Sequence, residues 1–187
     1  MLRGGRAVHP ISWILEDLQF DWKTLSLERY EELTDLGFAK FEDIATNDPD
    51  LSSLRVCGGK LLLTQAVNDQ VVQYASVVDY YRRVVVTCGG EAQTGSFARL
   101  FCTDGDIHGT IAGPGPGLTT ASAMTALMAW VEQGEAPEEI IAERVDVTTV
   151  QVVAARPTYP YPAVTRYKGS GDPAVASSYV ASLKSCR

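Results

Sequence analysis

A strand–helix unit occurs twice in succession in this 187-residue chain, and this repeat constrains the fold more than any other feature. The first unit has a short apolar run at residues 60–64, a polar loop, and apolar residues at helical spacing over 71–85. The second has an apolar run at 98–102, another polar loop, and a helical pattern over 119–131. Short apolar runs suit strands that are buried on both faces. Strands that alternate with helices predict a parallel sheet covered by helices, an α/β fold.

The residues at the ends of the two helical patterns are typical of helix boundaries. Gly89 and Gly90 can end the first helix, and Gly134 can end the second. Thr119 or Thr120 can cap the start of the second helix. The apolar face of this second helix is predicted to consist of Met124, Leu127, Met128 and Val131.

The first forty residues have a different pattern. Residues 1–25 contain an aromatic cluster with little periodicity, which predicts a packed irregular segment. Apolar residues at helical spacing over 27–36 predict a helix, with Ser26 as its N-cap and Gly37 as its end. We therefore divide the chain into an irregular segment, 1–25, and an α/β region, 26–187. A chain of this length suits one domain with a sizeable core.

Asp69 and His108 are the candidate catalytic residues. Each lies in the polar loop just past the carboxyl end of a predicted strand, which is where ligands bind in open α/β sheets. An Asp in that place can fix the tautomer of a His and stabilise the imidazolium that forms when the ring takes a proton. On pattern alone, such an Asp is more often a turn or cap residue, and a lone His is an ordinary loop residue. Their occurrence on consecutive strands is what favours catalysis.

Composition argues against several classes of partner. Sixteen basic and 23 acidic side chains give a net charge of −7, and no Lys/Arg stripe occurs, so nucleic acid is not expected to bind. No apolar run approaches the ~20 residues of a membrane span, and the start of the chain does not resemble a secretory signal, so no membrane partner is expected. The sequence does not indicate the cellular compartment of the protein.

A metal site is not expected either. The only histidines are His9 and His108, and no Cys-x-x-Cys motif occurs. Buried free thiols and a disulfide are both compatible with the four widely spaced cysteines, Cys57, Cys88, Cys102 and Cys186.

Several longer stretches add a family resemblance. "GGKLLLTQAVND" and "FARLFCTDGDIHGTIAGPGPG", together with "LMAWVEQGEAPEEIIAERVD", "RPTYPYPAVTRYKGSGDPAVASSYV" and "FDWKTL", resemble segments of the tannase and feruloyl esterase family of serine esterases. The resemblance covers most of the chain from about Phe20 onward. It implies the C-terminal part of an α/β-hydrolase fold, with residues 1–25 as the end of the lid and the return to the core. It also places Asp69 on the family's catalytic Asp and His108 on its catalytic His.

The chain also departs from the family pattern at several positions. The family's nucleophilic Ser lies in an N-terminal half that the matched part does not include, and no Gly-x-Ser-x-Gly motif occurs here. The family's calcium site lies in the lid, so no cofactor is expected in this chain. Gly109 stands where the family has a disulfide-forming Cys after the His, and Tyr159 replaces another Cys, which leaves Cys186 without its usual partner. Further differences flank both candidate residues, at Gln65, Ala66, Gln70, Asp104 and Asp106.

Two functions stay open at this point. The first is a carboxylic ester hydrolase acting on small aromatic esters, in which His108 is the general base, Asp69 orients it, and a Ser outside this chain attacks. On this hypothesis the chain alone would be close to inert. The second is a non-catalytic, diverged binding or vestigial module on the same scaffold. In either case, an exposed sheet edge and uncovered apolar helix faces predict self-association.

Overall fold

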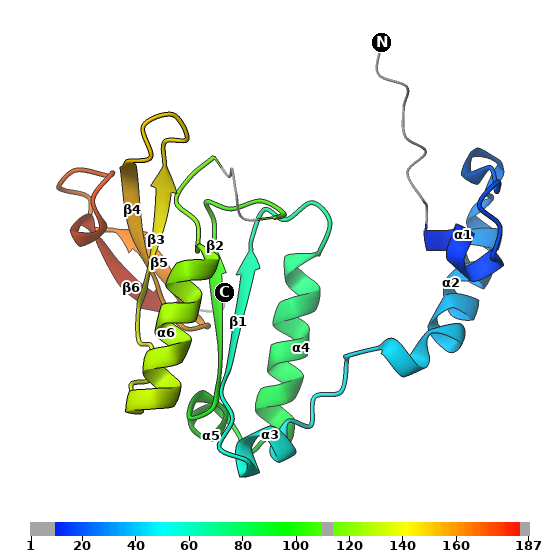
Figure 1. The fold of residues 1–187 in the computed structure, drawn as a ribbon, viewed down its shortest axis with the longest axis horizontal. Coiled ribbons are helices and arrows are strands. Elements are labelled where there is room, and N and C mark those ends of the chain that lie inside the picture. Colours follow the sequence, from blue (N-terminus) through cyan, green and yellow to red (C-terminus); the bar gives the residue numbers. More distant parts are fainter. Residues whose placement is uncertain (1–9, 110–113, 184–187) are drawn as a thin grey trace. The chain divides into compact units, whose positions relative to one another are not determined.

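The computed structural model describes residues 10–109 and 114–183 (Figure 1). By its internal contacts the chain divides into two compact units, Met1–Asp48 and Pro49–Arg187. The first unit contains α1 (Pro10–Leu15), the 3₁₀ turn η1 (Trp22–Thr24), α2 (Leu27–Lys40) and the 3₁₀ turn η2 (Glu42–Ile44). Our division of the chain at residue 25 stays a prediction, because it concerns the role of each part within a longer hydrolase.

Helix α2 begins as predicted and ends later than predicted. The Ser26 side chain accepts a hydrogen bond from the Arg29 N–H, which confirms the N-cap. The predicted end at Gly37 is wrong, since α2 continues to Lys40. Gly37 instead makes room for α1, because a Cβ there would lie 2.7 Å from Cδ1 of Ile14. Helix α1 also corrects the expectation that residues 1–25 are irregular. Its first helical position is occupied by Pro10, and this position favours proline.

The second unit contains the predicted strand–helix repeat and a strand-rich end. Its elements are α3 (Ser52–Val56), β1 (Leu61–Ala66), α4 (Tyr74–Thr87), α5 (Glu91–Gly95), β2 (Ala98–Thr103), α6 (Thr120–Gln133), β3 (Ile140–Val145), β4 (Val152–Thr158), β5 (Ala163–Tyr167), η3 (Ala176–Ser178) and β6 (Tyr179–Leu183).

Strands β1 and β2 form the parallel pair that the sequence predicts. They pair in register from Leu61 opposite Ala98 to Ala66 opposite Thr103. Because the strands run in the same direction and end opposite each other, the loops that follow them start at the same edge. In Figure 1 this edge lies at the upper ends of the two arrows.

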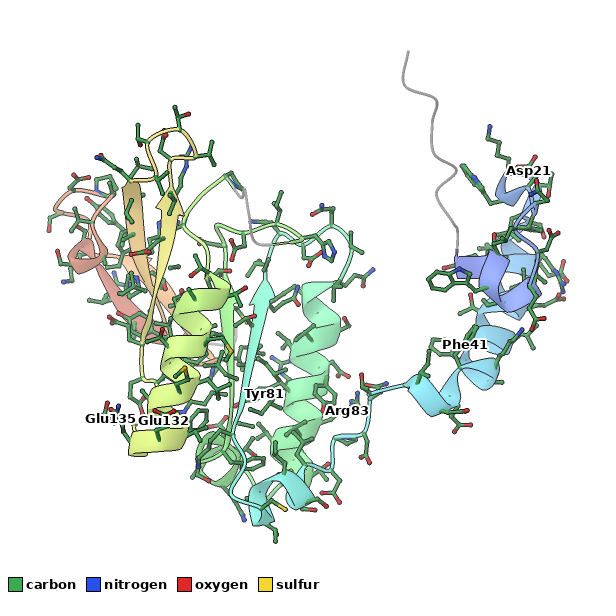
Figure 2. All side chains as sticks on the ribbon, viewed as in Figure 1. Asp21, Phe41, Tyr81, Arg83, Glu132 and Glu135 are labelled. Atoms are coloured by element: carbon green, nitrogen blue, oxygen red, sulfur yellow. The ribbon has the colours of Figure 1, made fainter. Side chains whose placement is uncertain are left out.

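Side chains of β2 alternate between two hydrophobic clusters. Leu100 packs with Val78 and Tyr81 of α4 on one face, and the Tyr81 hydroxyl donates to the Ala98 carbonyl oxygen. Tyr81 points from α4 toward the strands, whereas Arg83 points away from them (Figure 2). On the other face, Phe101 packs in a second cluster with Leu118, Ile140 and Ala142 and the partly buried Leu62 and Ala126. This period of two is what a strand buried on both faces requires.

Helix α6 has the predicted ends but not the predicted buried face. The Thr119 side chain accepts from the Ser122 N–H, and Gly134 ends the helix with a φ of 76°. The buried anchor of α6 is Trp130, whose ring centroid lies 5.4 Å from the Lys60 ammonium and 5.5 Å from the Arg99 guanidinium. Large apolar residues of the predicted face are exposed instead, at 49, 51 and 59% of their surface for Met124, Met128 and Val131.

The last four strands form two antiparallel hairpins, β3–β4 and β5–β6, which the sequence pattern did not predict. Phe101 of β2 forms a bridge with Pro160, which follows β4, and Gly117, which follows β2, forms one with Glu143 of β3. Across the described ranges no helix has the length and apolar character needed to span a membrane.

Candidate active site

Two loops meet at the edge where β1 and β2 end. The loop at 67–73 carries Asp69, and the loop at 104–119 carries His108. The loops are joined directly, because the Asn68 side-chain amide donates to the Asp104 carbonyl oxygen at 2.6 Å. A second link runs from the His108 backbone N–H to Oε1 of Gln70, at 3.3 Å.

The structure brings the two predicted site residues together. Nδ1 of His108 lies 3.1 Å from both carboxylate oxygens of Asp69. The Asp69 side chain is 10% exposed, whereas the His108 side chain is 47% exposed. At this distance the tautomer with its proton on Nδ1 donates to the carboxylate, which leaves Nε2 as the basic nitrogen.

Backbone amides hold the Asp69 carboxylate in place. Its Oδ1 accepts from the N–H groups of Val71 and Val72, each at 2.8 Å. Desolvation raises the pKa of the Asp69 carboxyl, but the hydrogen bonds from Val72, Val71 and His108 together outweigh it, so the net pKa lies below the usual value. Asp69 therefore does what a turn-forming Asp does and faces the histidine as well. Helix α4 begins at Tyr74, three residues after the Val71 that the apolar spacing had suggested.

A second carboxyl group, that of Asp106, lies in the same region but is buried. Its Oδ2 accepts from the Thr103 hydroxyl at 2.8 Å and from the Leu118 N–H at 3.0 Å. Burial raises the pKa of the Asp106 carboxyl, and the two hydrogen bonds offset only part of that effect. The sequence marked Asp106 only as a departure from the family pattern. The two residues that donate to the buried Asp106 carboxyl, Thr103 and Leu118, are not identified by any local sequence pattern.

The cavity beside the pair is small. It has a volume of about 90 Å³ and is lined by residues of both loops and both strand ends, among them Asp69, Thr103, Asp106 and Leu118. Binding sites for small molecules usually measure roughly 300–1,000 Å³. The cavity is thus far too small to hold an aromatic ester.

The described residues contain no group of three or more His, Cys, Asp or Glu side chains close enough to share a metal ion. Cys57, Cys88 and Cys102 are free thiols. Burial raises the pKa of the Cys102 thiol to about 11, which keeps it protonated and unreactive at neutral pH. His9 and Cys186 lie outside the described residues, so the prediction that Cys186 lacks its usual partner is not tested.

The family model for tannase and feruloyl esterase matches residues 10–182. The chain belongs to the tannase and feruloyl esterase family. This confirms the resemblance seen in the sequence, and it extends the match ten residues upstream of Phe20.

Relatives within the tannase and feruloyl esterase family are much longer than this chain. A probable feruloyl esterase from Arthroderma benhamiae is 32% identical over 169 residues, which cover 90% of this chain and 31% of that protein. A mono(2-hydroxyethyl) terephthalate hydrolase from Piscinibacter sakaiensis is 40% identical over 124 residues, which cover 66% of this chain and 20% of that protein. The chain therefore spans less than a third of the length of these relatives.

Two solved esterase structures confirm the α/β-hydrolase class of the fold. An esterase from Aspergillus oryzae superposes with a TM-score of 0.78 at 24% identity, over 90% of this chain and 36% of that one. Feruloyl esterase B from the same fungus gives a TM-score of 0.73 at 23% identity, over 90% of this chain and 35% of that one.

Proposed function

We propose that Asp69 and His108 are the acid and the base of a Ser-His-Asp triad that hydrolyses aromatic carboxylic esters, and that the Ser lies outside this chain. One observation carries the proposal. Nδ1 of His108 lies 3.1 Å from the Asp69 carboxylate, across two loops that follow adjacent parallel strands. The family membership supports a serine-type mechanism for this pair.

In the proposed reaction His108 moves a proton twice. It first takes the proton of the attacking Ser hydroxyl on Nε2, while the Asp69 carboxylate stabilises the imidazolium. The proton then passes to the leaving alcohol oxygen as the bond between the acyl carbon and that oxygen breaks. In the second half, water attacks the acyl-enzyme, His108 takes a proton from this water and returns it to the Ser oxygen, and the carboxylic acid leaves.

The proposed substrates are small esters of aromatic acids. The two relatives carry names that refer to esters of ferulic and terephthalic acid, and this supports the proposed class. Since the cavity beside Asp69 holds only about 90 Å³, we propose that most of the acyl-binding pocket comes from protein outside this chain. The mechanism needs no cofactor from the residues of this chain.

A non-catalytic module is the second candidate, and one observation favours it. Gly109, next to His108, has a φ of 92°, in the region where residues other than glycine are strained. The loop at this position has therefore adopted a backbone that the disulfide-forming Cys of the family would not readily share. On this proposal the scaffold is kept and turnover is lost.

Ester hydrolysis separates the two proposals. The test protein is this chain together with the residues encoded upstream of it, assayed with methyl ferulate. Loss of the base is expected to lower kcat on the order of 10⁴- to 10⁶-fold in His108→Ala, and Asp69→Asn to lower it about 10⁴-fold. Asp104→Asn is the control, because this exposed carboxylate lies in the same loop as His108. Unchanged turnover in His108→Ala, or the lack of an upstream Gly-x-Ser-x-Gly elbow, would support the non-catalytic module.

A further inference from the structure

The buried carboxyl of Asp106 stands two residues before His108, and the proposed triad does not use it. We propose that Asp106 is a positioning residue for His108, because its carboxyl fastens the base of the loop that carries the histidine. This inference rests on the proposed function, since it concerns how the same pair is held.

Both hydrogen-bond donors to Asp106 belong to fixed parts of the fold. Thr103, which donates its hydroxyl, is the last residue of β2 and is 5% exposed. Leu118, which donates its N–H, is 4% exposed and packs in the cluster with Phe101. The residue before it, Gly117, exchanges two backbone hydrogen bonds with Glu143 of β3. The carboxyl thus joins the end of one strand to a segment that a second strand holds.

Glycines at the base of the loop make this contact possible. A Cβ at Gly117 would lie 1.5 Å from Oδ1 of Asp106, so any larger residue there would displace the carboxyl. The Gly115 N–H donates to the Gly105 carbonyl oxygen at 3.0 Å, and a Cβ at Gly105 would lie 2.0 Å from the Pro116 carbonyl oxygen. The two ends of the loop therefore meet at the position of Asp106.

Fastening at Asp106 limits where His108 can go. Two residues of fully extended chain span at most about 7 Å, so His108 cannot move farther than that from an anchored point. Asp106 is 4% exposed, so its carboxyl would be costly to bury without hydrogen bonds. Removing the carboxyl would in turn leave the Thr103 hydroxyl and the Leu118 N–H without their acceptor. Gln70 adds a weaker restraint on the same histidine, through its exposed side chain.

The tautomer of His108 reports this positioning without any need for turnover. The test uses the chain as it stands, with the nitrogen chemical shifts of its histidine rings measured at about pH 9, where imidazole is neutral. His9→Gln assigns the signals, because the chain has only two histidines. In the unaltered chain the Asp69 carboxylate is expected to favour the tautomer with the proton on Nδ1.

Three substitutions separate fastening from charge. Asp106→Leu keeps the bulk but removes both hydrogen bonds, and it is expected to shift the tautomer ratio about tenfold toward the Nε2–H form. Asp106→Asn can keep both bonds without the charge and is expected to preserve the ratio of the unaltered chain. Asp104→Asn, in the same loop but exposed, is the matched control and is expected to change nothing.

The tautomer ratio of His108 in these variants supports or overturns the positioning role of Asp106. An unshifted ratio in a folded Asp106→Leu chain overturns the inference, and so does an Asp106→Asn chain that behaves like Asp106→Leu. If Asp106→Leu does not fold, Thr103→Val decides, since it removes only one donor and is expected to shift the ratio about threefold; no shift overturns the inference. Asp69→Asn separates this from the proposed function, because its failure to change the ratio would mean that the Asp69–His108 pair itself is absent.

Discussion

The two strand–helix units of this protein have the same architecture, but their helices differ in how much apolar surface they leave exposed. In the first, β1 leads through Asp69 into α4, which buries Val78, Tyr81 and Val84 against the strands. In the second, β2 leads through Asp106 and His108 into α6, which buries Trp130 and exposes methionines on its other side. Both helices have 14 residues. Most large apolar residues of α4 thus pack against other elements of this chain, whereas Met124, Met128 and Val131 of α6 are about half exposed.

The largest expected effect lies on the buried side of α4. Val84 is fully buried, so Val84→Asp would place an unpaired charge in the cluster with Phe97 and Ala98 and is expected to cost about 4 kcal/mol or more of unfolding free energy. Val86→Asp is the matched control, because this residue on the same helix is 82% exposed and its substitution is expected to cost about 0.5 kcal/mol or less. Urea denaturation measures both. Equal losses would remove the contrast between the two sides of α4.

Trp130 provides the corresponding test for α6. Trp130→Ala removes a buried ring and its contacts with the Lys60 and Arg99 cations, and it is expected to cost about 3–5 kcal/mol. Val131→Ala, one residue away on the exposed side, is expected to change the unfolding free energy by about 0.5 kcal/mol or less. A large loss from Val131→Ala would show that the outer face of α6 is covered in solution.

Self-association is expected to respond to the outer face of α6 while folding does not. Met128→Lys places a charge among exposed apolar residues, so we expect it to weaken self-association at least about tenfold, with the unfolding free energy within about 0.5 kcal/mol. Sedimentation velocity at several protein concentrations measures the self-association, and urea denaturation measures the unfolding free energy. Unchanged association would direct attention to the edge of β1 that does not pair with β2.

The smallest expected effect is a pair of opposite pH dependences. The pKa of Asp69 is lowered by folding, so its contribution to stability is present above its usual pKa and is lost as the pH falls through the lower folded value. The pKa of Asp106 is raised, so its contribution is complete below the usual pKa and is lost as the pH rises through the higher folded value. Thermal melts between about pH 3 and pH 7 should therefore show a shallower acid loss in Asp69→Asn and a shallower loss toward neutral pH in Asp106→Asn. Changes of the same sign in both variants would contradict these assignments.

Local signals predicted much of this fold. Ser26 and Thr119 are residue types that commonly cap helices, and both do so here. The alternation of side chains in β2 follows from its being buried on both faces. Asp69 and His108 could be paired from the sequence because in-register parallel strands bring their following loops to one edge. What failed depends on contacts distant in the sequence. Gly37 lies inside α2 where Ile14 of α1 comes close to it, a contact that no local pattern identifies. Local pattern likewise does not indicate which side of α6 meets the strands.

The double use of the Asp69 carboxylate affects how related chains should be interpreted. Two backbone amides need this side chain in order to form the turn, whether or not a reaction takes place. Selection for folding alone would therefore preserve the aspartate in a copy that has lost its activity. His108 is half exposed, so selection for folding constrains it far less. On the proposed function, retention of the histidine, and not of the aspartate, is therefore expected to distinguish active from inactive homologues.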